Sequence, residues 1–157
     1  MYTHTQISRQ PELKNRVEEF KELCRRRNLR VTEQRLEIFR TVAQSKEHPS
    51  AEAVFGQVRK KMPNISLDTV YRTLSSMEEA GLVSRVGNSN KARFDADLTP
   101  HSHFVCTACG EVYDVPAAVP DAALVPANIG EFGEVKNVNL QFRGICNRCR
   151  KAAGEKK

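Results

Sequence analysis

The chain of 157 residues contains no tryptophan, and aromatic residues make up only 6% of it. It also has no apolar run long enough to cross a membrane. Its first twelve residues are polar and lack the apolar core of a signal peptide. We therefore expect a cytoplasmic protein with no membrane partner. In that compartment Cys-x-x-Cys pairs bind metal or carry out redox chemistry more often than they form structural disulfides.

Four of the five cysteines form two Cys-x-x-Cys pairs, Cys106 with Cys109 and Cys146 with Cys149, with 36 residues between the pairs. Each such turn directs two thiolates at one ion, and two turns complete a tetrahedron, the closed arrangement that structural zinc prefers. The sequence therefore predicts a structural Zn²⁺ site. The fifth cysteine, Cys24, lies in helical register with apolar residues, so we expect it to be buried.

Charge is unevenly distributed along the chain. Residues 1–94 carry 18 Lys and Arg against 11 Asp and Glu, whereas residues 95–157 carry 7 against 8. A basic first half indicates an anionic partner. On charge alone, nucleic acid and a merely solvated basic surface are equally good explanations.

The basic half contains four helix signals in quick succession. Periodic apolar residues predict a first helix over residues 12–27. Thr32, Ser50 and Ser66 are each suited to N-cap one of three further helices. Gly81 suits the left-handed position that ends the fourth helix. This succession predicts a small helical domain.

The fourth helix has an outer face of short polar groups with one arginine and one tyrosine, namely Thr69, Tyr71 and Arg72. Arginine can pair bidentately with guanine, and a tyrosine ring can pack against thymine methyl groups. The face therefore suits a DNA major groove, although an ordinary amphipathic helix is the alternative.

The segment after this helix predicts two strands, over residues 82–86 and 91–94, joined by a turn cluster. A two-stranded wing after a recognition helix completes a winged helix-turn-helix. Arg85, Lys91 and Arg93 would then be placed to contact DNA phosphates.

A second set of possible metal ligands surrounds the first cysteine pair: Asp95, His101, His103 and Asp114. Side chains repeat every two residues along a strand, so His101 and His103 would share a face, and Asp114 lies on the strand predicted over residues 111–115. Imidazole and carboxylate ligands suit Fe²⁺ or Mn²⁺ and tolerate zinc. An iron enzyme could use such ligands, but no signal for a substrate pocket accompanies them, and we expect no enzyme.

Several segments resemble motifs of the ferric uptake regulator (Fur) family of metal-dependent repressors, in the order that the family has. They are Leu29–Arg35, His48–Glu52, Asp68–Leu74, His101–Cys106 and both cysteine pairs. The resemblance covers about residues 13–149. It implies an α+β fold with a winged helix-turn-helix DNA-binding domain over 1–90, a hinge over 91–97 and a small α/β dimerisation and metal-binding domain over 98–157, which holds the Cys₄ zinc site.

Within the family, the likeness is closer to the peroxide-sensing repressors. The resemblance assigns one regulatory site for Fe²⁺ or Mn²⁺ to His48, Asp95, His101, His103 and Asp114. It implies that iron and hydrogen peroxide oxidise His48 or His101, after which the metal leaves and the repressor releases DNA. Iron-sensing members typically have Glu where Asp114 stands.

The resemblance also implies the partners: a homodimer that binds double-stranded operator DNA, palindromic and rich in A·T pairs, with Arg30 in the minor groove. An iron- or manganese-responsive repressor of uptake genes is the nearest alternative. A zinc-thiolate redox chaperone that binds no DNA is another. The family has a helix within residues 115–128, where Pro116, Pro120 and Pro126 would shorten or break it.

Overall fold

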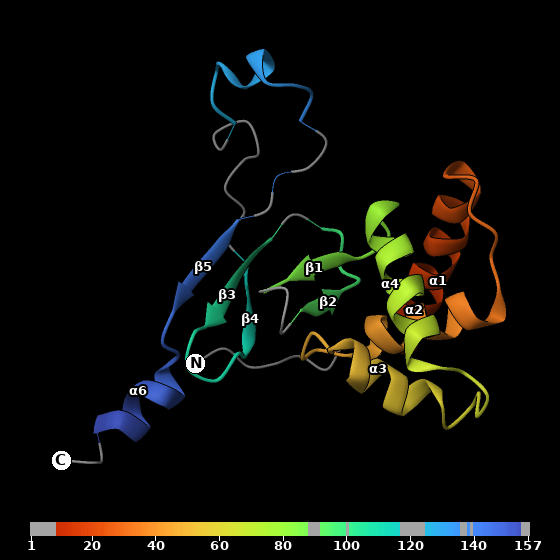
Figure 1. Ribbon diagram of the computed structural model, residues 1–157, viewed down its shortest axis with the longest axis horizontal. Coiled ribbons are helices and arrows are strands. Elements are labelled where there is room, and N and C mark those ends of the chain that lie inside the picture. Colours follow the sequence, from red (N-terminus) through yellow and green to blue (C-terminus); the bar gives the residue numbers. More distant parts are fainter. Residues whose placement is uncertain are drawn as a thin grey trace. The chain divides into compact units, whose positions relative to one another are not determined.

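The computed structural model describes residues 9–87, 92–99, 101–116, 125–135, 138 and 140–154. The chain divides into two compact units, Met1–Leu98 and Thr99–Lys157. The first contains four helices and a two-stranded sheet, and the second a three-stranded sheet and a C-terminal helix (Figure 1). The predicted α+β fold is confirmed. Over the described residues, no helix is long and apolar enough to cross a membrane.

The helices of the first unit are α1 (Arg9–Arg26), α2 (Glu33–Gln44), α3 (Ala51–Val58) and α4 (Leu67–Glu79). The three predicted N-caps are confirmed. The side-chain oxygens of Thr32, Ser50 and Ser66 each accept a hydrogen bond from the backbone N–H three residues further on. Each cap satisfies one of the N–H groups that the first turn of a helix leaves without a partner.

The end of α4 is set by Gly81, whose φ of 69° is left-handed. The Gly81 N–H donates to the Glu78 carbonyl at 2.9 Å, and the Leu82 N–H donates to the Met77 carbonyl at 2.8 Å. These two bonds form the Schellman motif, which a residue without a Cβ adopts readily. The prediction that Gly81 ends the fourth helix is confirmed, and the turn leads the chain directly into the wing.

The apolar core of the first unit is shared by all four helices. Phe20 of α1 stacks on Phe39 of α2 with ring centroids 4.1 Å apart. Leu74 and Met77 of α4 are fully buried in the same cluster. Cys24 is fully buried there too, as its helical register predicts.

The wing consists of β1 (Ser84–Val86) and β2 (Arg93–Asp95), which pair antiparallel. Its tip, residues 88–91, lies outside the described residues. The Phe94 N–H donates to the Pro49 carbonyl at 3.0 Å, which ties β2 to the segment before α3. Because His48 precedes Pro49 and Asp95 follows Phe94, this bond brings His48 next to Asp95.

The second unit contains a sheet in the order β4-β3-β5. Its strands are β3 (Ser102–Cys106), β4 (Val112–Val115) and β5 (Gln141–Gly144), and a short 3-10 turn, η2 (Ile129–Glu131), precedes β5. β4 runs antiparallel to β3, and β5 runs parallel to it. The helix α6 (Asn147–Gly154) follows.

The sequence predicted an extended segment at His101 and His103 and a strand over residues 111–115, which pair as β3 and β4. It predicted neither the pairing of β5 with β3 nor the helix α6. Residues 117–124, most of the stretch in which the prolines were expected to shorten a helix, lie outside the described residues. The predicted effect of the three prolines on that helix therefore stays a prediction.

Candidate metal centres and DNA-binding face

The four paired cysteines come together within the second unit. Cys106 ends β3, Cys109 lies in the turn that follows, and Cys146 and Cys149 lie around the start of α6. Their sulfur atoms all lie within 4.8 Å of one another, and Cys109 Sγ is 3.9 Å from Cys146 Sγ. Ligands at the usual Zn–S distance in a tetrahedron lie about 3.8 Å apart. The four sulfur atoms therefore fit a structural zinc ion.

Backbone N–H groups favour the ionised form of Cys106 and Cys146, whereas the hydrogen bond with Cys146 raises the pKa of Cys149 to about 12. The Cys146 N–H donates to Cys106 Sγ at 3.3 Å, and the Cys149 N–H donates to Cys146 Sγ at 3.5 Å. The first bond is the main reason that the pKa of Cys106 falls to about 6. The second likewise lowers the pKa of Cys146. Thiolates are the form that binds zinc, so the backbone prepares the site for its ion.

Two further residues beside this cluster were not predicted from the sequence. Arg148 Nη2 donates to Glu111 Oε2 at 2.6 Å and to Cys109 Sγ at 3.7 Å. The bond to Glu111 is the main reason that the pKa of Arg148 is raised. Four thiolates around one Zn²⁺ would carry a net negative charge, and an N–H of this guanidinium that reaches Cys109 Sγ would partly offset it. The sequence feature that could have indicated this role is the position of Arg148 between Cys146 and Cys149.

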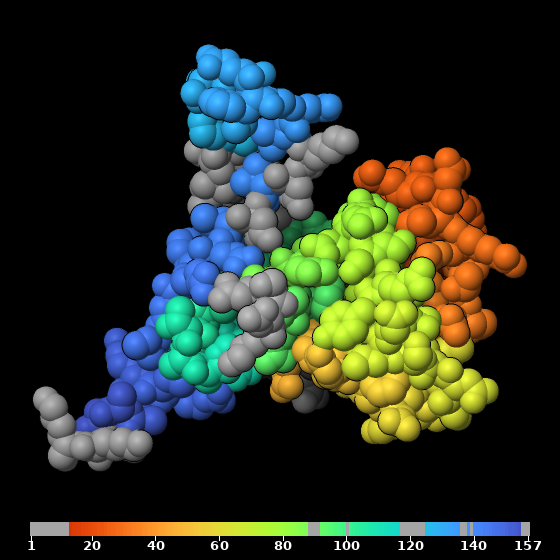
Figure 2. All heavy atoms as spheres, viewed as in Figure 1, coloured from red at the N-terminus to blue at the C-terminus, as the bar shows by residue number. Residues whose placement is uncertain are grey.

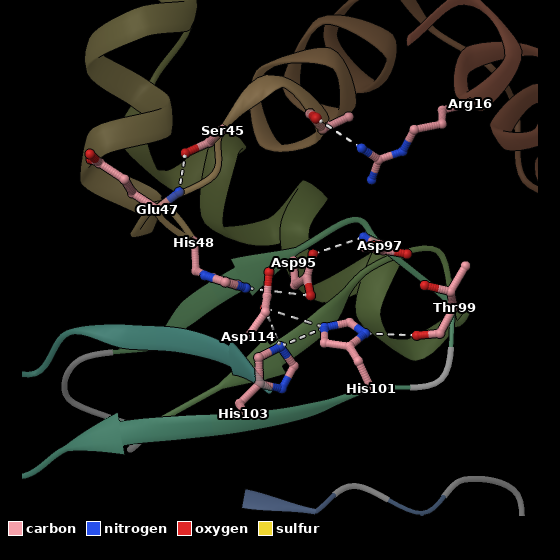
Figure 3. A network of polar contacts seen from close by, with 11 residues as sticks. Arg16, Ser45, Glu47, His48, Asp95, Asp97, Thr99, His101, His103 and Asp114 are labelled. Carbon is pink, nitrogen blue, oxygen red and sulfur yellow. Dashed lines mark hydrogen bonds and ion pairs between the residues drawn. The ribbon is translucent and has the colours of Figure 1, made fainter. Parts of the chain in front are cut away.

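The second unit also contains a cluster of imidazole and carboxylate groups, which Figure 3 shows as sticks. His101 Nε2 lies 2.9 Å from His103 Nε2, and Asp114 Oδ1 lies 3.5 Å from the first and 3.6 Å from the second. The strand register causes this arrangement, because His103 of β3 stands opposite Asp114 of β4. Two ligands about 2.1 Å from an ion and at right angles lie about 3.0 Å apart, so the imidazoles fit a shared metal.

The tautomer of His101 makes its Nε2 atom available as a ligand for such a metal. His101 Nδ1 lies 2.7 Å from the Thr99 carbonyl oxygen, which can only accept a hydrogen bond. Nδ1 therefore carries the proton and donates it, and Nε2 keeps its lone pair. A backbone carbonyl that fixes the tautomer in this way is the usual support for a metal-binding histidine.

The first unit contributes a pair of the same chemistry, also visible in Figure 3. His48 Nε2 lies 3.5 Å from Asp95 Oδ2, and both residues are buried. The Asp97 N–H holds the other oxygen of Asp95 at 2.8 Å. His48 has a φ of 47°, a left-handed value that is uncommon for a residue with a Cβ. Strained backbone of this kind is found most often at functional sites.

The outer face of α4 presents the predicted base-reading residues. Tyr71 is exposed, and 82% of the Arg72 side chain is accessible. Arg72 lies 3.8 Å from Asp68 one turn earlier, an exposed ion pair that holds it only weakly. The Thr69 hydroxyl is hydrogen-bonded to the Ser66 hydroxyl at 2.8 Å and so supports the N-cap.

The residues predicted to contact phosphate or the minor groove differ in how they are held. Arg30 is exposed, and Arg93 on β2 is half-buried. Arg85 pairs with Glu78 at 2.9 Å, and its guanidinium lies 5.5 Å from the centre of the Phe94 ring. These contacts brace the wing against α4. Lys91 lies outside the described residues.

Comparison with known proteins agrees with this architecture. The model of the Ferric uptake regulator family matches residues 26–122. The chain is 31% identical over 142 residues to the peroxide operon regulator of Bacillus subtilis, covering 89% of this chain and 94% of that protein. It is 30% identical over 135 residues to the transcriptional regulator FurA of Mycobacterium bovis, covering 85% and 91%.

Among solved structures, the ferric uptake regulator from Pseudomonas aeruginosa with manganese matches with a TM-score of 0.63 and 29% identity. The match covers 81% of this chain and 97% of that one. The family match spans more than half of the residues and includes α2, α3, α4, the wing and the first cysteine pair. The chain is therefore a member of the Ferric uptake regulator family and resembles its peroxide-responsive repressors.

Proposed function

We propose that this protein is a metal-dependent transcriptional repressor that senses hydrogen peroxide through the oxidation of a ligand histidine. The main observation in support is the convergence of His101 Nε2, His103 Nε2 and the Asp114 carboxylate within one unit. The unit that carries the DNA-binding helix holds a matching pair, His48 and Asp95. Both sets would be ligands of one regulatory site for Fe²⁺ or Mn²⁺, as the family resemblance implies.

The connection between the two sets makes a shared metal feasible. Only residues 96–100 separate Asp95 from His101, a span of about 20 Å even when fully extended. An ion that takes ligands from both sets restrains the orientation of the two units. Metal affinity and DNA affinity are then coupled, and each raises the other by the same factor.

A homodimer converts this restraint into DNA recognition. Two copies of α4 must enter major grooves about 34–36 Å apart to read the two halves of a palindromic operator. The regulatory metal would set that separation. Exposed Arg72, exposed Arg30 and the basic charge of residues 1–94 support an operator of double-stranded DNA; its A·T-rich character is expected from the family.

The peroxide response follows from the chemistry of the ligands. In the net reaction, a ring carbon of His48 or His101 would gain one oxygen atom and lose two electrons, and hydrogen peroxide would accept those two electrons and leave as water. Ferrous iron held by these ligands would supply the one-electron chemistry that cleaves the O–O bond, and it would recover the electron from the oxidised ring. The oxidised ring is a poorer ligand, so the remaining side chains lose the metal and the dimer loses its operator. With Mn²⁺ in the same site, the protein would bind DNA and ignore peroxide.

Two facts support the peroxide signal in particular. The family resemblance implies that iron-sensing members typically have Glu where Asp114 stands, and the Bacillus subtilis relative is a peroxide operon regulator. The second candidate is an iron- or manganese-responsive repressor of uptake genes. It is supported by the similarity to FurA and to the Pseudomonas aeruginosa protein with manganese.

Mass spectrometry of the iron-loaded protein separates the two candidates. After anaerobic loading and addition of hydrogen peroxide, we expect a peptide containing His48 or His101 to gain the mass of one oxygen atom. The manganese-loaded protein, treated identically, is the control and should gain none. Metal-stimulated DNA binding without any oxygen gain on histidine would identify a metal-responsive repressor instead.

The substitution Asp114→Glu tests the same point on the ligand itself. The longer carboxylate should preserve metal-activated DNA binding but reduce the rate at which peroxide abolishes it. Fluorescence anisotropy with a labelled operator, followed after peroxide addition, measures both quantities. A variant that binds DNA and loses it to peroxide at the wild-type rate would show that Asp114 does not tune the signal.

A further inference from the structure

The hydroxyl of Tyr71 is already engaged within the DNA-binding unit. Tyr71 lies on the outer face of α4 with 42% of its surface exposed, and its Oη donates a hydrogen bond to Glu52 Oε1. Glu52 lies in the first turn of α3, two residues after the N-cap Ser50. The surfaces of α3 and α4 lie side by side, in gold and yellow-green in Figure 2. An acidic residue of α3 therefore holds the polar end of a side chain expected to read bases.

The ionisation of the two groups fixes which one donates. The hydrogen bond from Tyr71 is the main reason that the pKa of Glu52 is lowered, and the positive charge of Arg93 contributes to the same shift. The same bond raises the pKa of Tyr71. The carboxylate therefore stays ionised and the phenol stays protonated at neutral pH, so Tyr71 donates and Glu52 accepts.

This bond determines what Tyr71 can offer to DNA. A phenolic O–H that donates to Glu52 is not free to donate to a phosphate or a base edge. The accessible remainder of the side chain is its ring, which suits apolar contact with the 5-methyl group of thymine. A ring held at its hydroxyl also has less freedom to lose when DNA binds.

We propose that Glu52 is a positioning residue of the DNA-reading face. It holds the Tyr71 hydroxyl so that the ring meets the base edges, and the protein thereby distinguishes thymine from a base that lacks the methyl group. This inference rests on the proposed function, because it requires α4 to enter the major groove. It adds a residue on α3 to a recognition surface otherwise built from α4 and the wing.

The test compares thymine with deoxyuridine, which differs only by the methyl group. The probe is a duplex selected from a random library by the manganese-loaded wild-type protein, with each thymine replaced in turn by deoxyuridine. We expect the wild type to lose about fourfold in affinity at a contacted thymine, the value of one buried methyl group. Glu52→Ala, at an exposed position that should not affect folding, should bring this ratio close to one.

Three variants distinguish positioning from charge. Glu52→Gln keeps a carbonyl acceptor and removes the charge, so it should keep the wild-type thymine preference while binding all duplexes more tightly. Tyr71→Phe keeps the ring and removes the hydroxyl, so it should lose the preference as Glu52→Ala does. The double variant Glu52→Ala/Tyr71→Phe should be no worse than either single one, because both remove the same hydrogen bond.

The outcomes separate this inference from the proposed function. A wild type that selects no sequence in the presence of metal would overturn the proposed function and this inference with it. A wild type that selects an operator, together with a Glu52→Ala variant that keeps the full thymine preference, would overturn the inference alone. Tighter binding of all duplexes by Glu52→Ala and Glu52→Gln, with an unchanged preference in both, would likewise overturn it and reduce Glu52 to a source of phosphate repulsion.

Discussion

Different interactions stabilise the interiors of the two units. In the first, a continuous apolar cluster runs from α1 through α4 to β2. In the second, the buried apolar side chains among the described residues are Val105, Val112 and two of the zinc-site cysteines, Cys106 and Cys146. The first unit is thus stabilised by apolar packing, whereas the centre of the second coincides with the Cys₄ site.

This difference gives two metals two roles. A domain of about 60 residues without a substantial core usually needs a metal, a disulfide or a partner to fold. The second unit also exposes Phe142 and Ile145, which supports the proposed homodimer. Zinc therefore belongs to the fold of one unit, while the regulatory metal, with ligands from both, would control how the units act together.

The largest expected effect is the loss of zinc. Cys106→Ser should lose the ion, the dimer and the structure of the second unit, because structural zinc contributes on the order of 10 kcal/mol to the folding of small metal domains. Zinc content, size-exclusion chromatography and circular dichroism measure the three losses. Cys24→Ala is the matched control: it removes a buried cysteine of the first unit and should keep zinc. A cooperatively folded, zinc-free Cys106→Ser dimer would show that the second unit does not depend on zinc for its fold.

Weakening the first unit should leave zinc in place. Phe20→Ala removes a fully buried ring that stacks on Phe39, and it should lower the free energy of unfolding of the first unit by about 3–5 kcal/mol. Urea denaturation followed by circular dichroism gives the stability, and metal analysis gives the zinc content. If Phe20→Ala released the zinc as well, the stability of the first unit and zinc binding by the second would not be independent, contrary to this prediction.

Replacing the exposed arginine of α4 should affect sequence preference more than stability. Arg72→Ala should reduce operator affinity by about 1–3 kcal/mol and relax the preference at one base pair, since the Arg72 side chain is exposed and its ion pair with Asp68 is weak. Binding to operators with single base changes, measured by anisotropy, shows the relaxed position. An unchanged preference would mean that α4 is not the reading helix.

The smallest expected effects, on stability and on the salt dependence of DNA binding, distinguish Arg85 from Lys91 in the wing. Arg85→Ala should lower the stability of the first unit by up to about 1 kcal/mol, because it removes the pair with Glu78 and the contact with Phe94. Lys91→Ala should leave stability unchanged and reduce the salt dependence of DNA binding by about one unit. A larger change in salt dependence from Arg85→Ala than from Lys91→Ala would reverse these assignments.

The features that the sequence predicted are those governed by short-range rules. The N-caps Thr32, Ser50 and Ser66 and the ending at Gly81 follow from the local chemistry of the backbone and were predicted correctly. The Cys₄ cluster follows from the spacing of the cysteines in the same way. The side-by-side placement of His101 and His103 follows from the two-residue period of a strand.

The features that were missed depend on contacts between distant segments. The parallel pairing of β5 with β3 brings residue 141 beside residue 103, and no local pattern in a four-residue strand indicates that partner. Glu52 looked like an ordinary acid in the first turn of a helix, and its bond to Tyr71 arises only when α3 packs on α4. Glu111 and Arg148 likewise meet only after both cysteine pairs have come together.

His48→Ala tests most directly whether a metal shared by the two units controls DNA binding. His48 is the candidate ligand imidazole of the first unit, so its loss leaves His101, His103 and Asp114 to hold a metal within the second unit alone. The measurement is operator binding by anisotropy with anaerobic ferrous iron, on protein checked for zinc content and dimer formation. We predict a zinc-containing, folded dimer whose DNA affinity no longer responds to metal. Metal-stimulated binding equal to that of the wild type would contradict the account.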